Sequence, residues 1–542
     1  MVTRRTQSTP RIQIGLSKIA RNIVAGIFFL IFVAVVFFSG SIEYACKHSF
    51  TANNQVFFLL VGFVFVCVCL LVVTLSLGRF RKIKGLLETE HSFLLFVSIG
   101  SLALIFVQIF IVKSAWFVTD WDARALADVG NPESLVPYLS RYPNQIFLYS
   151  AFRLISLVGG VLGVESTYLS LVLGGCLCVA AAIWFSSIAA RNLFGITVGY
   201  ITFAVLFAFV GVSPWILVPY SDAYGILCPS IVLFCFSLSR ETKLKWAAIS
   251  FFSLVGYFIK PTSIFAFISV LLIELFLLVE KKGKGKKYIL EIATKKIVPT
   301  FFGIIAAFGL SACLGHFSPE IDKSKSFSMT HFLMMGANTE RMGVYPDNDV
   351  ALSASISDPK ERKAVNISTW LGRIEEMKPE GIASLSLKKT LTNFADGTLA
   401  WSNEGKFWVE IRGDNLNVKD YYGIGNFSSS EENPMGKEFQ ANSQIIWLLI
   451  LFGVCLGVFR KNVKNGELVA YLSILMLAVF LMIFECRARY LFLYLPYFVM
   501  LGVAGWAAIF RKLINVAKKG KSARLYVGKG KSNLSVSHAD RV

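Results

Sequence analysis

The chain has 542 residues, of which 55% are hydrophobic and only 16% are charged, and its formal net charge is +20. Soluble domains carry about 25% charged residues, whereas repeated apolar runs of about 20 residues are typical of membrane-spanning helices. The composition therefore excludes an ordinary soluble protein and predicts an all-α polytopic membrane protein. The apolar runs are continuous, so a β-barrel is excluded as well.

Apolar segments recur along the whole chain. They lie at 23–40, 56–78, 92–112, 146–163, 166–189, 194–213, 224–239, 245–259, 262–280, 297–316, 444–459, 467–486 and 490–510. This pattern predicts a bundle of about 12 to 13 membrane segments. The expected regions are a cytoplasmic basic N-terminus (1–22), an accessory transmembrane hairpin (23–90), a transmembrane core (91–316), an extracytoplasmic loop or small domain (317–443), the C-terminal transmembrane helices (444–510) and a basic cytoplasmic tail (511–542).

The basic residues are grouped between apolar runs and at the two ends of the chain. The groups are Arg4, Arg5, Arg11 and Arg21; Arg79, Arg81, Lys82 and Lys84; Lys281, Lys282, Lys284, Lys286 and Lys287; Lys461 and Lys464; and the tail after Arg511. Such placement is typical of cytoplasmic loops, so we expect membrane lipids as partners and no nucleic acid. The ten cysteines fall mostly inside apolar runs and predict neither disulfides nor a zinc site.

Crossings counted from the basic N-terminus place residues 113–145 outside. Counting back from the basic tail places 317–443 and the turns at 220–224 and 485–490 outside as well. The two counts agree only if one apolar segment between residues 145 and 190 does not cross, and 146–163 is the better candidate for a re-entrant or interfacial segment. The polar stretches on the outer face are then expected to converge on one cavity.

The first outer stretch contains the pair Asp120 and Asp122 in the string TDWDAR, and residues 131–142 are expected to form a short surface helix behind it. Carboxylates at a membrane surface are costly to desolvate and by default indicate function. They can act as a general base on a hydroxyl group or hold a divalent cation, Mg²⁺ or Mn²⁺. The alternative is a solvated loop in which an aspartate caps a helix.

The outer turns also carry cations. Arg487 and Arg489, with Glu485 and Tyr490 beside them, can bind phosphate oxygens; the alternative is that they anchor a helix end at the lipid headgroups. Lys260 is a second candidate phosphate contact or a helix-end anchor. Asp222, in the short turn PYSD, either belongs to the site or only bonds its own backbone.

The long segment 317–443 supplies His331 and several Trp and Tyr residues, including those of DGTLAW, that could stack on sugar rings. A lone histidine is more often structural than catalytic. The chain has no Walker A motif, dinucleotide-binding glycine motif or nucleophile elbow, so ATP-driven transport and serine hydrolase chemistry are not expected.

The order of these motifs carries a resemblance over roughly residues 90–510. The strings TDWDAR, YLSRYPNQ, RNLFG, PYSD and ECRARYLFLYLP follow one another on the predicted sides of the membrane. This order resembles the GT-C fold membrane glycosyltransferases, in particular bacterial relatives of the dolichyl-phosphate-mannose–protein mannosyltransferases. The acidic loop follows the third apolar segment here, whereas members of that group commonly place it after the first.

The resemblance implies an inverting transfer of a sugar from a polyprenyl-phosphate donor to a cell-envelope glycan or protein, outside the plasma membrane. Asp120 would be the best match for the base and Asp122 its close competitor, while Arg487 and Arg489, with Tyr490 and Lys260, would hold the donor phosphate. The expected pocket residues are Arg124, Tyr138, Arg141, Tyr142, Asn144, Asp222, His331 and Glu485.

Two other functions compete with the enzyme. A transporter or flippase for a lipid-linked glycan should carry charged residues near the middle of the membrane and often internal repeats. Here Arg153 and Glu274 are the clearest ionisable residues inside the apolar segments, and no repeat is evident. A non-catalytic scaffold would leave the carboxylates and arginines of the outer face unexplained.

Overall fold

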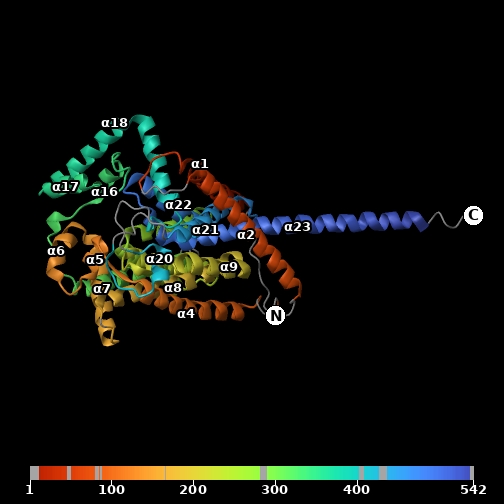
Figure 1. The fold of residues 1–542 in the computed structure, drawn as a ribbon, viewed down its shortest axis with the longest axis horizontal. Helices are drawn as coiled ribbons and strands as arrows, with labels where there is room; N and C mark the ends of the chain where they lie inside the picture. Colours follow the sequence, from red (N-terminus) through yellow and green to blue (C-terminus); the bar gives the residue numbers. More distant parts are fainter. Residues whose placement is uncertain are drawn as a thin grey trace, which may run out of the picture.

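The computed structural model describes residues 11–45, 51–79, 85, 88–164, 166–280, 290–401, 408–425 and 436–536. Long apolar helices run side by side and form one elongated bundle (Figure 1). Its helices are α1 (Arg11–Phe38), α2 (Ala52–Arg79), α4 (Glu90–Ala115), α8 (Thr167–Phe194), α9 (Ile196–Leu206), α11 (Leu227–Ser237), α12 (Lys243–Ile259), α13 (Phe265–Glu280), α15 (Val298–Gly315), α21 (Lys437–Cys455), α22 (Asn465–Ile483) and α23 (Leu495–Val536).

Among the described residues, eight helices are long and apolar enough to cross a membrane, and three shorter apolar helices accompany them. Helices satisfy their backbone hydrogen bonds internally, which a bilayer requires. Their outward faces carry large apolar side chains, such as Phe106 on α4 and Phe302 on α15, which are exposed. The prediction of an all-α polytopic membrane protein is therefore confirmed.

One end of the bundle, which we call the basic end, gathers cationic loops from distant parts of the chain. The Arg21 side chain on α1 donates to the Arg460 carbonyl (2.9 Å), and Arg460 in turn pairs with Glu467 on α22 (3.1 Å). Lys464 donates to the Asn192 carbonyl at the end of α8 (2.7 Å). The two counts of crossings placed these loops on one side, and the structure brings them together.

The opposite end, which we call the capped end, carries most of the short elements and the long helix α18 (Figure 1). They are β1 (Phe117–Thr119), α5 (Trp121–Ala127), α6 (Pro132–Arg141), η1 (Pro143–Gln145), α7 (Ile146–Val161), η3 (Pro214–Leu217), α10 (Ser221–Gly225), η4 (Pro261–Ile264), η6 (Lys323–Lys325), α16 (Met329–Gly336), α17 (Asp347–Ser355), α18 (Pro359–Phe394), β2 (Trp408–Ile411), α20 (Leu416–Tyr422) and η8 (Ala488–Tyr494). The remaining short helices are η2 (Phe207–Gly211), η5 (Ala293–Ile297) and η7 (Leu456–Phe459). Helix α6 matches the short surface helix expected at 131–142.

Helix α7 runs across the bundle axis (Figure 1). Its last residues are apolar and point away from the protein, with Val161 88% and Leu162 76% exposed. An apolar helix end in this orientation is suited to the boundary between headgroups and acyl chains. Segment 146–163, predicted to be re-entrant or interfacial, thus lies across the other helices and exposes its apolar end.

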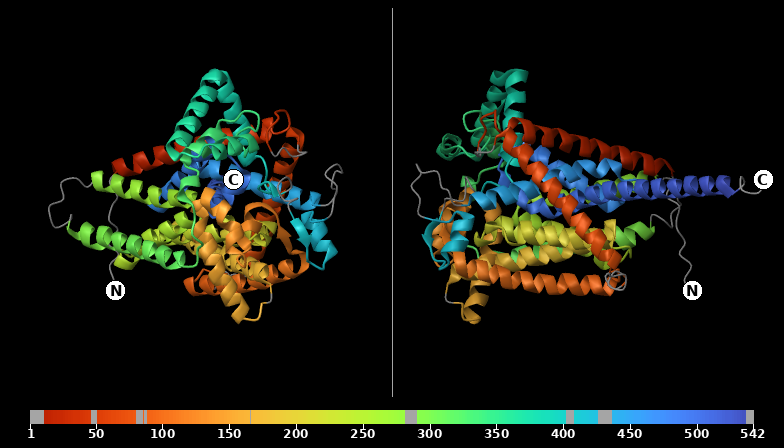
Figure 2. Two further views of the ribbon diagram at one scale, coloured as in Figure 1. Left: turned by 90° about the vertical axis from the view of Figure 1, so that its left-hand side faces the viewer. Right: turned by 45° about the vertical axis from the view of Figure 1, so that its right-hand side comes forward.

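Helices α16, α17 and α18 form a lobe on the capped end, on the side of the bundle opposite α7 (Figure 2, left). Arg373 on α18 binds both carboxylate oxygens of Asp349 on α17 (2.8 and 2.6 Å), and this contact holds α17 against α18 within the lobe. A two-stranded antiparallel sheet pairs Phe117 with Ile411 and so ties the acidic loop to the segment that follows the lobe.

Helix α1, the first helix of the predicted accessory hairpin, packs into the core of the bundle. Phe28 on α1 is fully buried and contacts the rings of Phe394 on α18 and Phe498 on α23. Trp447 on α21 joins the same cluster and donates to the Phe394 carbonyl (2.8 Å). A second boundary also shifts, because α21 begins at Lys437 with a polar first turn that hydropathy does not detect.

Candidate functional site

The two aspartates of the acidic loop lie in different environments. Trp121, between them, has φ of +52°, a left-handed backbone conformation that costs a non-glycine residue about 1–3 kcal/mol. Asp120 is exposed at the start of α5, and its side chain makes no capping hydrogen bond. Asp122 is half-buried and reaches the interior of the capped end. The strained residue thus separates an outer carboxylate from an inner one.

Asp122 is bound by a tyrosine from the PYSD turn. The Tyr220 hydroxyl donates to Asp122 Oδ2 (3.1 Å), and Gln145 Nε2 donates to that hydroxyl (3.2 Å). Tyr138 on α6 lies beside both groups, and its pKa is raised first by burial and then by Tyr220 and Asp122. The inner carboxylate therefore has a fixed position at the centre of a polar network.

Two buried cations, Lys260 and Arg489, lie next to this network, and we call them the cation pair. The Lys260 ammonium forms an ion pair with Asp222, and Arg489 Nε lies 3.7 Å from the other oxygen of the same carboxylate. All three side chains are buried, with exposed fractions of 3% for Asp222, 8% for Lys260 and 4% for Arg489. Two cations share one carboxylate here, and the charge of the buried Glu485 also acts on Lys260.

Aromatic rings line the cation pair. The Arg489 guanidinium carbon lies 5.0 to 5.9 Å from the ring centres of Trp121, Trp215, Tyr220 and Tyr490. Lys260 Nζ lies 4.4 Å from the Tyr490 ring centre. Such contacts stabilise a cation that has lost its water shell. The strained Trp121 is one of these rings, so the acidic loop also takes part in holding Arg489.

A second carboxylate, Glu485, lies near the same tyrosines as Asp122. Glu485 is buried and accepts from Arg487 Nε (3.1 Å) and from the Tyr490 hydroxyl (3.3 Å). Burial raises the pKa of Tyr142 and of Tyr345, and the charges of both Asp122 and Glu485 raise these pKa values further. Both phenols therefore lie within the field of the two carboxylates.

The other predicted residues lie at the edge of the site or outside it. Arg124 and Arg141 are exposed, and Arg141 acts on the site only as a charge near Tyr142. Asn144 lines a neighbouring apolar pocket. Among the described residues, no group of three or more His, Cys, Asp or Glu side chains could hold a metal ion, so Asp120 and Asp122 have no third ligand of these types.

His331 is a buried residue of the lobe and is separated from the site by two rings. Its ring lies 4.3 Å from that of Phe327, which contacts Tyr142 at 5.5 Å. His331 Nδ1 is 2.8 Å from Ser353 Oγ. Burial lowers the pKa of His331 to about 4, so the ring is neutral at neutral pH. The expectation that it lines the pocket does not fit this position.

Acid is expected to destabilise the lobe through His331. The unfolded chain binds a proton near pH 6.5 and the folded lobe only near pH 4, so stability falls as the pH drops through this range, by about 3 kcal/mol in total. Thermal unfolding followed between pH 7 and 4 measures this effect, and His331→Gln should reduce the slope. His316→Gln, at an exposed histidine, is the matched control. Equal slopes in wild type and His331→Gln would contradict this assignment.

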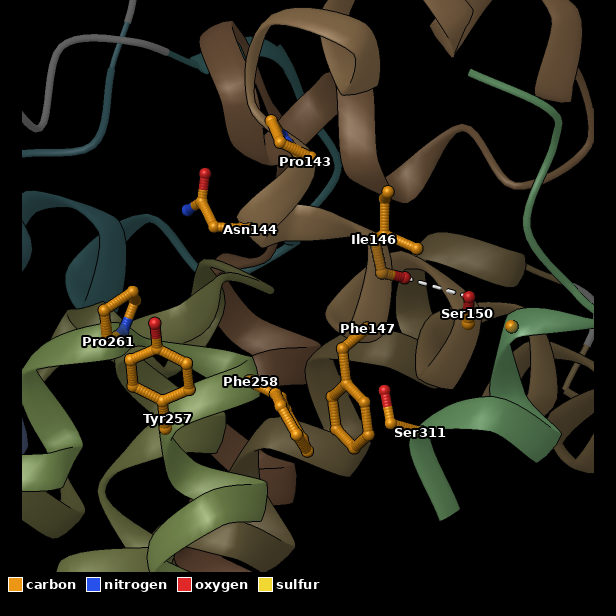
Figure 3. A pocket seen from close by; sticks show the side chains of 10 residues that line it. Pro143, Asn144, Ile146, Phe147, Ser150, Tyr257, Phe258, Pro261 and Ser311 are labelled. Atoms are coloured by element: carbon orange, nitrogen blue, oxygen red, sulfur yellow. Dashed lines mark hydrogen bonds between the residues drawn. The ribbon is translucent and has the colours of Figure 1, made fainter. Parts of the chain in front are cut away.

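An apolar pocket of about 280 Å³ opens beside the site (Figure 3). It lies between η1, α7, α12 and α15 and is lined by Pro143, Asn144, Ile146, Phe147, Ser150, Tyr257, Phe258, Pro261, Ser311 and Gly315. Pro261 directly follows Lys260 in the chain. The pocket therefore extends from α7 to the residue next to Lys260.

Sequence reasoning missed several residues of the site. Tyr220 and Trp121 belong to quoted motifs, but no pattern indicated that the tyrosine would bind Asp122 or that the tryptophan would contact Arg489. Gln145 is the last residue of the string YLSRYPNQ, but no pattern indicated that it would bind Tyr220. Tyr345 is one of several aromatic residues in the segment 317–443, and its sequence context does not indicate that it lies in the site.

Comparison with known proteins identifies the chain at the level of a family. The model of a family described as "Conserved hypothetical integral membrane protein" matches residues 16–509, which include every residue of the site. No curated protein and no solved structure matches the chain.

Proposed function

Since the chain belongs to the conserved hypothetical integral membrane protein family, we propose an activity from the site itself. The protein is a glycosyltransferase that moves a sugar from a polyprenyl-phosphate donor to a cell-envelope glycan or protein, with inversion at the anomeric carbon. Such a reaction needs one base and one anion clamp, and it needs no nucleotide. The site has a candidate for each role.

Asp122 is the base of the proposed reaction. It removes the proton of an acceptor hydroxyl while that oxygen attacks the anomeric carbon. The bond between this carbon and the phosphate oxygen breaks, and its electron pair leaves with the polyprenyl phosphate. Asp122 is preferred to Asp120 because it is the carboxylate that Tyr220 and Gln145 hold inside the site. The resemblance alone favoured Asp120, which is exposed.

Arg489 and Lys260 are the clamp for the donor phosphate. A guanidinium can bind two phosphate oxygens at once, and a buried cation is worth more than an exposed one because little water competes for it. Asp222 is the carboxylate that both cations share, so the donor phosphate competes with this carboxylate for them. Arg487, already paired with Glu485, is a second contact at the edge.

The observation that carries the proposal is the position of Tyr220. Its hydroxyl binds the proposed base, and its ring lies against the proposed clamp, with 5.0 Å between the ring centre and the Arg489 guanidinium carbon. One side chain therefore sets the spacing between the base and the leaving group. An in-line displacement requires such a fixed spacing between the two.

The capped end faces outward in this proposal. Positive loops remain in the cytoplasm, and the opposite end of the bundle holds Arg21, Arg460 and Lys464. The acceptor then reaches Asp122 from the outside of the plasma membrane, past the lobe. The donor arrives from the outer leaflet, where α7 lies across the bundle axis.

The test is transfer of radiolabelled sugars from a panel of polyprenyl phosphates by the purified protein in detergent or lipid nanodiscs. Wild type should transfer label to an envelope acceptor, and Arg489→Gln should weaken donor binding by about 2–5 kcal/mol, because it leaves Asp222 and the phosphate without their shared partner. Arg341→Gln, at an exposed arginine of the lobe, is the matched control.

The result that contradicts the proposal is donor binding without transfer to any envelope acceptor. Movement of a fluorescent lipid-linked sugar across liposomes that contain the protein would then assign the site to a flippase. If transfer continues in the presence of EDTA, the base and the clamp are sufficient for the reaction. If EDTA abolishes transfer, the reaction also needs a divalent cation.

A further inference from the structure

The lobe reaches the site through one turn, residues 336–346, which carries Tyr345. Gly343 in this turn has φ of +79°, and its carbonyl accepts from the backbone N–H of Cys486 (2.9 Å). Gly336 packs so closely on the backbone of Ile483 and Phe484 that a Cβ atom would not fit. The turn and the stretch 484–487 are therefore in direct backbone contact, and together they present Tyr345, Glu485 and Arg487.

Lys389, near the end of α18, lies behind this contact and is only 1% exposed. Its ammonium donates to the carbonyls of Gly336 (2.8 Å) and Phe484 (2.7 Å). Burial lowers the pKa of Lys389 to about 8, which reflects the cost of removing the charge from water. A lysine in this position must therefore make strong contacts in return.

The two carbonyls explain why a cation lies there. Gly336 is the last residue of α16, and Phe484 follows the last residue of α22. The last carbonyls of a helix have no partner within the helix and carry a partial negative charge. Two helix C-termini from distant parts of the chain thus meet at one ammonium group.

We propose that Lys389 is a positioning residue of the site. It caps α16 and α22 together, and so it fixes the wall formed by Tyr345, Glu485 and Arg487 in its place at the site. The inference that this wall serves sugar transfer rests on the proposed function. The inference that Lys389 holds the wall does not, and the two can be tested separately.

Cys486 reports on the wall without reference to any activity. Its thiol is fully buried and donates to the Met342 carbonyl (3.5 Å), so it reacts only when the wall opens. The measurement is the rate of N-ethylmaleimide labelling of the Cys486 peptide, followed by mass spectrometry of the folded protein. Lys389→Met keeps the length of the side chain and removes its hydrogen bonds, and it should raise the rate by about tenfold or more.

Two further variants make this measurement specific. Lys388→Met places the same substitution one residue away, at a lysine that is only partly buried, and should leave the Cys486 rate unchanged. Lys389→Arg keeps the charge and the donors and should restore most of the protection. If Lys389→Met does not fold, Gly343→Ala tests the same contact, because its Cβ would lie 2.9 Å from Lys389 Cε. Unchanged labelling in a folded Lys389→Met or Gly343→Ala protein would overturn the proposal.

Transfer kinetics test the link to the site. A displaced wall should lower kcat by about 100-fold in Lys389→Met and weaken donor binding much less, because Arg489 and Lys260 lie outside this wall and only the edge contact Arg487 lies within it. Faster labelling with unchanged kcat would reduce Lys389 to a structural residue and overturn the positioning role. If wild type transfers no sugar, the proposed function fails, while the labelling result still decides whether Lys389 holds the wall.

Discussion

Asp122→Asn is expected to reduce sugar transfer by about 10²- to 10⁴-fold, the usual contribution of a general base. Asparagine has nearly the same shape and can still accept the hydrogen bond from Tyr220, which the structure places at 3.1 Å from Asp122 Oδ2. The network should therefore remain assembled while the proton acceptor is lost. Turnover by purified protein at saturating donor measures the effect, and donor binding should stay within about threefold of wild type.

Asp120→Asn is the matched control for this experiment. It removes the same charge two residues away, from a side chain that is exposed and makes no capping hydrogen bond. Its turnover should remain close to that of wild type. The opposite pattern, with Asp120→Asn inactive and Asp122→Asn active, would restore the assignment that the family resemblance favoured and would refute the one made from the geometry.

Asp222→Asn is expected to cost about 3–5 kcal/mol of stability, the usual result when one partner of a buried ion pair is removed. The substitution leaves Lys260 and Arg489, both more than nine-tenths buried, without the carboxylate that they share. Thermal unfolding of the detergent-solubilised protein measures the loss. The same variant should also bind anions less selectively, because two unpaired cations then attract any phosphate.

A compensating variant separates this effect from a simple loss of packing. Asp222→Asn combined with Lys260→Met removes one of the two unpaired charges and should recover part of the stability. Glu291→Gln breaks an ion pair whose two side chains are about half exposed, and its melting temperature should match wild type within error. If Asp222→Asn had the same melting temperature as wild type, the buried charge cluster would not contribute to stability as proposed.

The sequence predicted those parts of the fold that depend on hydropathy and charge. Apolar runs marked the helices, and the position of basic loops placed Arg21 and Arg460 at one end, where the structure joins them. The counts of membrane crossings also required one apolar segment that does not cross the membrane, and α7 lies across the bundle. The sequence could not show that α1 belongs to the core, because a phenylalanine that faces lipid and one that faces a neighbouring helix are alike in composition.

The candidate site was predicted as a set of turns on one face, and only in part as a set of contacts. The predicted side of the membrane was enough to place Asp122, Asp222 and Arg489 at the same end of the bundle. The difference in exposure between Asp120 and Asp122 depends on the left-handed backbone of Trp121. No residue pattern predicts this conformation for a tryptophan. Lys389 was missed for a similar reason, since its partners are backbone carbonyls and have no side-chain signature.

The buried charge cluster also sets an order of assembly in the membrane. Asp222 and Lys260 belong to neighbouring parts of the chain, so they can neutralise each other as soon as α10 to α12 have been inserted. Arg489 comes much later in the chain, at the start of η8, and only its arrival closes the ring of aromatic side chains around the cations. A nascent chain that stops before η8 therefore holds the neutral Lys260–Asp222 pair without Arg489, the other half of the proposed clamp.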